Sequence, residues 1–551
     1  MKNLKKYLKI HYVILAFIIL TAIFLRLYNH EKLLNFQLDQ SRDAIIVSNF
    51  VDQGFEKIPL LGPQARGSEL MLGPVFYYFQ SIAVFFFGNR PDVLAFPDLL
   101  FSVLLIPLLY VFLRLYFSKN ICLIITALGA TSLFLIIYGR FAWNPNSLPF
   151  FTLLTAYGLL KSNRFKSIEP PWLYLAAAST AVASQLHFVY FLATPFIIIS
   201  YFIFWKPKFK LKHYLIATLT IAIIYIPVII SETRSGGANS KAFVQTIIGK
   251  KEKDKHNIVE DVFRAYQETQ KMNWEIITSE KGNNVIPTRG FNITCNKECR
   301  QKIPLLILQF LFFGSGIVAS IFIYKKEKDE NRRKFVFLIW IWTSSLFLVF
   351  TLIAYQLSLR FYLPLVVPFL TLFGFTLEKL GNFSGKKGSS VVILIGLFFV
   401  FLNLRSSLIY LKEHDSMFSK IVSNPKGNYF FNDEKITLEQ LQATTDYIKE
   451  IQPSESPIRI IADNKYARSI YYLLNYRDDI SACYVKWSSF HPTGTKSCFL
   501  ILQADWEKEL PSELDNLFSV EKRKKIGNLD IFYLKTKKID LKSEEDYCWA
   551  E

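Results

Sequence analysis

Cysteine and histidine are scarce in this chain, which has six of the first and seven of the second among 551 residues. A structural zinc site needs four such ligands close together. The cysteines nearest in sequence, Cys295 and Cys299 in "CNKEC", have no histidine nearby. We therefore expect no zinc at this pair and predict no particular cofactor; a short disulfide is the other interpretation of the pair.

Acidic residues are few as well. The chain has 45 Asp and Glu against 64 Lys and Arg, which gives a net charge of +19. Such an excess can indicate nucleic-acid binding. Here, however, the basic residues are spread through short loops between apolar runs, where membrane topology places them. We therefore expect membrane lipids as partners and no nucleic acid.

Hydrophobic residues, by contrast, make up 51% of the chain, and 16% of it is aromatic. Apolar runs near the ~18–20 residues needed to cross a bilayer recur along the chain. The pattern predicts an α-helical polytopic membrane protein whose first run, followed by no small-residue cleavage site, stays as an anchor. The predicted spans are 11–28, 93–117, 120–139, 147–161, 172–187, 188–205, 213–231, 303–324, 335–355, 361–378 and 390–404.

One further apolar run, "GPVFYYFQSIAVFFFG" at 73–88, is short for a span. The basic loops decide how to interpret it; they are 1–9, 114–120, 161–167, 206–213, 325–334 and 378–387. All of them face the cytoplasm only if 73–88 does not cross the bilayer. We therefore predict a re-entrant or interfacial helix there, about eleven spans in the cytoplasmic (inner) membrane, a cytoplasmic N-terminus and an extracytoplasmic C-terminus.

This topology gathers the unusual polar segments on the outer face. They are 29–92, 138–147, 184–190, 232–302 and 356–364. A membrane domain at 1–404 and an extracytoplasmic domain at 405–551 are the predicted units. A single outward-facing site would need this common sidedness.

The tail of the chain has a different pattern. Helical periodicity at 437–451 and 465–476 alternates with three buried-strand patterns, at 457–463, 496–504 and 529–535. Helices alternating with strands predict a small α/β domain. Cys483 and Cys498 could form a disulfide within it.

The stretch "NFQLDQSRDAII" places Asp39, Arg42 and Asp43 just after the first span. A helix beginning near residue 39 would put the two carboxylates on one face, since they are four residues apart. A structural interpretation is that the helix dipole stabilises acidic residues near the N-terminus of a helix. The functional alternative is a general base beside an anion-binding arginine: the carboxylate takes a proton from a hydroxyl, and the arginine neutralises a lipid-linked phosphate.

Other polar residues stand at predicted outer helix ends. Arg140 is either a phosphate ligand or an arginine that reaches the interface, with Trp143 as an interfacial aromatic. His187 is either a packing residue or part of a site. Arg360 is a second arginine on the same side, and two arginines with an acid pair suggest a polyanion site.

At these residues the sequence resembles the GT-C membrane glycosyltransferases, in particular glycosyltransferase family 39, which includes protein O-mannosyltransferases and lipid A aminoarabinose transferases. "DQSRDA" is similar to the family's first outer loop, which implies Asp39 as the catalytic aspartate. "GSELMLGPVFYYF", "GRFAWNPN" and "RFYLPLVVP" resemble later family motifs in the same order. Together with the resemblance, these residues predict a substrate or lipid-phosphate site, with an interfacial position as the alternative for the two adjacent tyrosines: Arg42, Glu69, Tyr77, Tyr78, Arg140, Asn144, Asn146, His187, Arg360 and Tyr362.

Two positions depart from the family pattern. Gln40 and Asn146 are amides where the family has acids. The loss of two carboxylates weakens any divalent-metal site, so we predict no metal ligands and keep a divalent metal only as a weakly supported alternative. Asp43 or Glu69 could replace the missing second carboxylate.

The resemblance implies inverting transfer of one sugar from a polyprenyl-phosphate-sugar donor to an acceptor on the outer face. The acceptor could be a protein, a lipid or a glycan. Two alternatives remain: a lipid-linked glycan polymerase or ligase, for which the long charged loop 232–302 would fit, and a lipid or glycan transporter. The absence of an internal repeat argues against the transporter.

Overall fold

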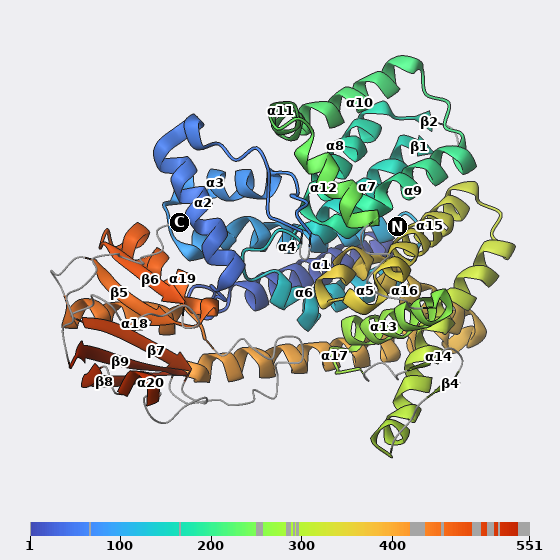
Figure 1. Cartoon of the computed structure of the whole chain (residues 1–551). Coiled ribbons are helices and arrows are strands. Elements are labelled where there is room, and N and C mark those ends of the chain that lie inside the picture. The colour runs from blue at the N-terminus through green and yellow to red at the C-terminus, as the bar shows by residue number, and fades with distance from the viewer. Residues whose placement is uncertain are drawn as a thin grey trace.

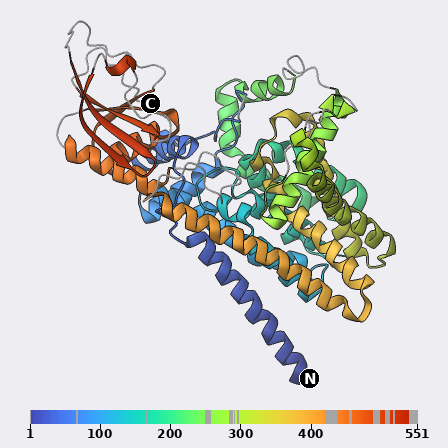
Figure 2. The same cartoon turned by 90° about the horizontal axis from the view of Figure 1, so that it is seen from below.

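A computed structural model gives the architecture of the chain (Figure 1). It describes residues 2–65, 68–164, 167–248, 257–282, 288–289, 292–293, 297–418, 436–452, 457–486, 497–503, 512–515 and 518–537. The N-terminal end of α1 (Lys2–Leu27) and the C-terminal sheet lie at opposite ends of the molecule (Figure 2).

Helices make up most of the described chain before residue 418. Seven of them are long and apolar enough to cross a membrane, and the bent pair α10–α11 would make eight. Their outward faces expose large apolar side chains such as Phe17, Leu219 and Phe401, as lipid contact requires. The protein is therefore an integral membrane protein, while the total of about eleven spans remains a prediction. The helices of this part are α1, α2 (Leu38–Gln53), α3 (Val75–Phe87), α4 (Pro91–Leu113), α5 (Lys119–Thr131), α6 (Leu133–Tyr138), α7 (Leu148–Ser162), α8 (Pro170–Leu186), α9 (Phe188–Trp205), α10 (Leu211–Ile224), α11 (Ile226–Arg234), α12 (Ala238–Ile248), α13 (Ile258–Thr278), α14 (Lys297–Lys326), α15 (Glu330–Leu352), α16 (Val366–Phe383) and α17 (Gly388–Asp415).

The segment predicted as one continuous span at 120–139 is broken, because α5 ends at Thr131 and α6 begins at Leu133. The break frees backbone groups that must find partners inside a membrane protein. Ser279 Oγ accepts from the Leu133 amide at 3.0 Å, and Ser407 Oγ donates to the Thr131 carbonyl at 2.9 Å. Side chains from distant parts of the chain thus satisfy the break, which hydropathy alone does not reveal.

The short apolar run at 73–88 forms α3, a helix of 13 residues. At about 1.5 Å per residue it is shorter than the roughly 30 Å hydrocarbon core of a bilayer. Its last turn exposes three phenylalanines, Phe85, Phe86 and Phe87. The length and this exposed face support an interfacial or re-entrant helix, whose depth in the bilayer stays a prediction.

The C-terminal α/β domain is confirmed. Its sheet has the order β6-β5-β7-β9-β8. Strands β5, β6 and β7 run parallel to one another, and β9 is antiparallel to both of its neighbours, β7 and β8. Two of these strands, β6 and β8, are additional to the three predicted strands. The elements are α18 (Leu438–Ile451), β5 (Ile458–Ala462), α19 (Asn464–Tyr472), β6 (Ala482–Lys486), β7 (Ser497–Gln503), α20 (Ser512–Asp515), β8 (Phe518–Ile526) and β9 (Leu529–Thr536), and the two-residue strands β1 (Asn163–Arg164), β2 (Ser167–Ile168), β3 (Thr288–Arg289) and β4 (Asn292–Ile293) lie earlier in the chain.

The proposed boundary between the two domains falls within a helix. The last apolar run, predicted at 390–404, belongs to α17, which continues to Asp415. This helix leads from the membrane part toward the sheet domain (Figures 1 and 2). The division at 404/405 therefore cuts a continuous element, and the domain assignment stays a proposal.

Cys483 and Cys498 do not form a disulfide with each other, although the sequence left this pairing open. Cys483 is disulfide-bonded, but Cys498 has a free, buried thiol, whose pKa burial raises to about 12. The reason is topological: Cys483 lies in β6 and Cys498 in β7, on opposite sides of β5. Strands two apart are separated by roughly 9–10 Å, too far for a disulfide. Of the proposed pair, Cys295 lies outside the described residues and Cys299 is described only by its backbone, at the start of α14, so this disulfide stays a proposal.

Candidate active site

The candidate site is built around the first turns of α2. The helix is capped by an amide: Gln40 Oε1 accepts from the backbone N–H of Gln37 at 3.2 Å. Such a bond satisfies one of the free donors at a helix start. Gln40 therefore stabilises the helix that carries Asp39 and Asp43.

Asp39, Arg42, Asp43 and Tyr77 form one hydrogen-bonded cluster. Arg42 donates to Asp39 Oδ1 through Nη1 at 3.0 Å and to Asp43 Oδ1 through Nε and Nη2 at 2.9 and 2.7 Å. The hydroxyl of Tyr77, on α3, donates to the same Asp43 oxygen at 3.0 Å. The structure thus brings together four of the residues predicted for the site, and Arg42 bridges the two acids.

The two carboxylates differ in environment. The Asp39 side chain is 40% exposed, whereas that of Asp43 is completely buried. Burial raises the pKa of Asp43 to about 6, although Arg42 and the Tyr77 hydroxyl oppose the shift. Burial also works against the Arg42 charge, but Asp43 and Asp39 outweigh it and keep the Arg42 pKa above its ordinary value. Asp39 is the carboxylate that a substrate can reach.

This arrangement predicts a pH dependence set by Asp43. Activity should fall as the pH drops through about 6, because protonated Asp43 no longer holds the Arg42 charge. Stability should change in the opposite direction. The pKa of Asp43 in the folded protein is higher than its ordinary value of 3.8. The Asp43 carboxyl therefore stabilises the folded state most at low pH, and this contribution is lost as the pH rises through about 6.

Rate and thermal unfolding measured together from about pH 5 to about pH 8 check both trends. In Asp43→Asn the decline of activity near pH 6 should disappear. An unchanged decline in that variant would show that another group titrates.

Trp143 completes the environment of Asp39. Its indole N–H donates to Asp39 Oδ2 at 3.1 Å. Buried Asp98, on α4, fixes the loop that carries Trp143: its Oδ2 accepts from the Trp143 backbone N–H at 3.0 Å and its Oδ1 from the Ser147 hydroxyl at 2.5 Å. Trp143 was interpreted only as an interfacial aromatic, and Asp98 was missed because it lies inside an apolar helix. The acid in that helix was the available signal.

Arg360 lies on the far side of Trp143. Its guanidinium stacks over the indole ring, with 4.8 Å between the guanidinium carbon and the ring centroid, and over the neighbouring Phe361 ring at 5.5 Å. The His187 ring contacts the same Phe361 ring edge-on at 5.1 Å. His187 also begins α9, where its Nδ1 accepts from the Val189 amide at 3.3 Å. Residues distant in sequence therefore extend the cluster from Asp39 to His187.

Arg140, in contrast, makes hydrogen bonds that stabilise the fold. It is buried, and its guanidinium donates to the carbonyls of Leu25, Arg26 and Tyr28 at 3.1, 2.8 and 2.7 Å. These carbonyls belong to the end of α1, where a cation is favourable. Arg140 therefore caps that helix, and we do not include it among the proposed phosphate ligands.

The other predicted residues also have local roles. Asn144 and Asn146 hold their own loop by donating to the carbonyls of Leu186 and Phe141, each at 2.7 Å. Tyr362 is buried against Phe350, with ring centroids 4.8 Å apart.

Two predicted residues lie in or against the loop before α3. Tyr78 donates to the Pro59 carbonyl at 2.8 Å and so fixes this loop to the helix. Glu69 is exposed on the same loop. No hydrogen bond described here joins either residue to Asp39.

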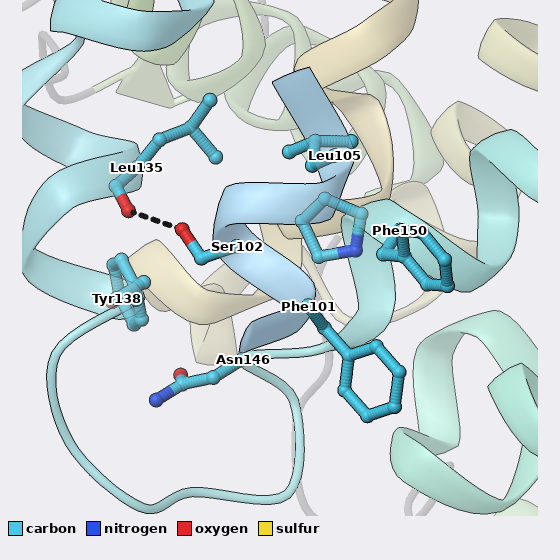
Figure 3. A pocket seen from close by; sticks show the side chains of 9 residues that line it. Phe101, Ser102, Leu105, Leu135, Tyr138, Asn146 and Phe150 are labelled. Atoms are coloured by element: carbon cyan, nitrogen blue, oxygen red, sulfur yellow. Dashed lines mark hydrogen bonds between the residues drawn. The ribbon is translucent and has the colours of Figure 1, made fainter. Parts of the chain in front are cut away.

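A small cavity lies behind the Trp143 loop, between α4, α6 and α7 (Figure 3). Its volume of about 10 Å³ suits one water molecule. Ser102, Asn146 and Phe150 line it, and the Ser102 hydroxyl donates to the Leu135 carbonyl at 3.4 Å. A sugar cannot fit in this cavity.

The two predicted outer loops contact each other. Asn239, at the start of α12, clamps the backbone of Met71 with both ends of its amide: Oδ1 accepts from the Met71 N–H at 2.8 Å and Nδ2 donates to the Met71 carbonyl at 3.0 Å. This contact joins segments 29–92 and 232–302. It supports their assignment to one side of the membrane.

The side chains of the candidate site do not fit a divalent metal. The described residues contain no group of three or more His, Cys, Asp or Glu side chains placed to hold an ion. The two positions where the resembled family has acids carry Gln40, which caps α2, and Asn146, which bonds Phe141.

Trp143→Phe is expected to lower kcat about tenfold, because it keeps a ring beneath Arg360 but removes a hydrogen bond to a carboxylate. Trp340→Phe is the matched control: it also removes an indole N–H bond, to Ser320 Oγ at 2.8 Å, between α15 and α14. Steady-state kinetics of the two variants make the comparison. Equal losses would mean that Trp143 acts on stability alone.

The comparisons with known proteins concern the family and the fold. Residues 72–230 match the family model described as dolichyl-phosphate-mannose-protein mannosyltransferase. Crystal structures of ArnT from Cupriavidus metallidurans share the fold: the form bound to undecaprenyl phosphate has a TM-score of 0.53 and the apo form 0.54. Each is 11% identical, over 96% of this chain and 98% of the other. No curated protein sequence matches the chain.

The fold is that of an integral membrane protein with an acid–arginine cluster at the start of α2, the helix that follows its first apolar helix. The family match and the fold shared along nearly the whole chain identify it as a glycosyltransferase of the GT-C fold class. The predicted fold class, a helical membrane part with a C-terminal α/β domain, is confirmed.

Proposed function

We propose that this enzyme transfers one sugar from a polyprenyl-phosphate-linked donor to a hydroxyl of an acceptor on the outer face of the cytoplasmic membrane, with inversion at the anomeric carbon. The observation that carries the proposal is the exposed Asp39 carboxylate, held by Trp143 on one oxygen and Arg42 on the other. The undecaprenyl phosphate bound to ArnT, a protein of the same fold, supports a polyprenyl donor.

In this mechanism Asp39 is the general base. The acceptor oxygen attacks the anomeric carbon, its proton passes to Asp39, and the bond between that carbon and the phosphate oxygen breaks. Arg42 and Trp143 already occupy one position on each carboxylate oxygen, so they orient the group toward the acceptor. Asp43 forms an ion pair with Arg42 and keeps it in position.

The departing lipid phosphate gains a negative charge as the bond breaks. A preorganised cation near that oxygen lowers the barrier, since the charge develops only in the transition state. Arg360 is our candidate, because it stacks on Trp143 and so lies beside the ring that contacts Asp39. Arg42 is less available, because its donors already bridge two carboxylates.

Reconstitution tests the proposal directly. Purified protein in liposomes, given a labelled polyprenyl-phosphate-sugar and extracts of envelope proteins, lipids or glycans in turn, should label one acceptor class and release polyprenyl phosphate. Release of label in repeating chains would support the polymerase alternative. Movement of the intact donor across the bilayer without its cleavage would support the transporter.

A further inference from the structure

The C-terminal α/β domain forms hydrogen bonds with the loop that leads into α2, the helix that carries Asp39 and Asp43. The first backbone N–H groups of α18 donate to the loop before α2: Leu438 to the Leu34 carbonyl at 2.9 Å and Glu439 to the Lys32 carbonyl at 3.3 Å. These N–H groups have no partner within their own helix, so the loop caps α18. Gln37, just before α2, returns a bond from Nε2 to the Ile436 carbonyl at 3.2 Å.

The same domain holds α2 again further along. Helix α19 packs against α2 (Figure 1). The buried Tyr472 hydroxyl donates to Asn89 Oδ1 at 2.6 Å, and Asn89 Nδ2 donates to Ser48 Oγ, on α2, at 2.8 Å. Tyr476 adds a second bond, to Asn49 Oδ1 at 3.2 Å. The Phe36 and Tyr472 rings also contact each other, with centroids 5.3 Å apart.

The contact at Ser48 lies across α2 from Asp39. Ser48 is nine residues beyond Asp39, which is about two and a half helical turns and therefore the opposite side of the helix. Asp39 and Asp43 face Trp143 and Tyr77, while Ser48 and Asn49 face the C-terminal domain. Any rotation or shift of α2 that breaks the second set moves the first.

We propose that the C-terminal domain is a clamp that sets the position of α2, and that Tyr472 is a positioning residue for Asp39 and Asp43. This inference rests on the proposed function for its kinetic consequence only. The contacts themselves predict a local effect on α2 whether or not the reaction is the one proposed. A catalytic base must be held within a fraction of an ångström, so a looser α2 should lower kcat more than it changes donor binding.

Tyr472→Phe in the full-length protein tests the clamp, because it removes only the hydroxyl. Tyr466→Phe is the matched control: Tyr466 lies on the same helix, is equally buried, and donates to the Ile501 carbonyl of the sheet at 3.1 Å instead of toward α2. We expect kcat to fall about 3- to 10-fold in Tyr472→Phe with KM for the donor nearly unchanged, and neither to change in Tyr466→Phe.

Amide hydrogen exchange supplies the readout that does not depend on activity. Tyr472→Phe should speed exchange in α2, and Tyr466→Phe should not. Asn89→Ala should speed it equally, and the double variant with Tyr472→Phe should add nothing, since both remove one linkage.

Unchanged exchange in α2, or equal loosening by Tyr466→Phe, overturns the clamp whatever the kinetics. Faster exchange in α2 with no sugar transfer by any form, wild type included, supports the clamp and tells against the proposed function. Faster exchange with a full wild-type kcat in Tyr472→Phe also overturns the positioning role.

Discussion

Asp39→Asn is expected to lower kcat by about 100- to 10,000-fold, the range that a positioned general base supplies. The amide keeps the shape of the side chain and one acceptor oxygen, but it cannot take the acceptor proton. The bond from Trp143 Nε1 or the bond from Arg42 loses its acceptor as well. Because the side chain is 40% exposed, the fold should tolerate the change.

Single-turnover transfer with a polyprenyl-phosphate-sugar donor, in liposomes, measures the effect. Asp52→Asn is the control: it makes the same substitution at an exposed position at the other end of α2. Membrane insertion and thermal unfolding should match wild type in both variants. Full activity of Asp39→Asn would remove Asp39 from the mechanism and leave Asp43 as the acid to test next.

The periodic features of the fold could be predicted from the sequence. Apolar runs gave most of the membrane helices, and buried-strand patterns gave β5, β7 and β9 of the C-terminal sheet. The pairing of Cys483 could not be predicted, because strand order is a property of the whole sheet. The break at Ser132 was hidden for a similar reason: the serines that satisfy it lie far away in sequence.

The site divides in the same way. The spacing of Asp39, Arg42 and Asp43 on one helix made their cluster predictable, since four residues return a side chain to the same face. Arg140 could not be separated from Arg360 by sequence, because both stand beside aromatics at helix ends. Only packing shows that the first caps α1 and the second stacks on Trp143.

Arg360→Gln is the second large effect that we expect, a loss of about 100- to 1,000-fold in kcat, as for removal of a group that stabilises developing charge. Glutamine keeps a polar, though shorter, side chain but has no positive charge to offer the leaving phosphate. Arg360→Lys should recover part of the rate, since it restores the charge without the planar group that stacks on Trp143.

Arg264→Gln is the matched control for Arg360→Gln. Arg264 also stacks on an aromatic ring, that of Tyr355 at 4.3 Å, but on α13 and away from Asp39 in its described contacts. The second readout is inhibition by the product, polyprenyl phosphate, which carries the full charge that the transition state only develops. If Arg360 faces that phosphate, Arg360→Gln must weaken product inhibition along with kcat, whereas Arg264→Gln leaves both unchanged. A loss of kcat with undiminished product inhibition would place Arg360 beneath Trp143 as a support for the ring and move the phosphate to another cation.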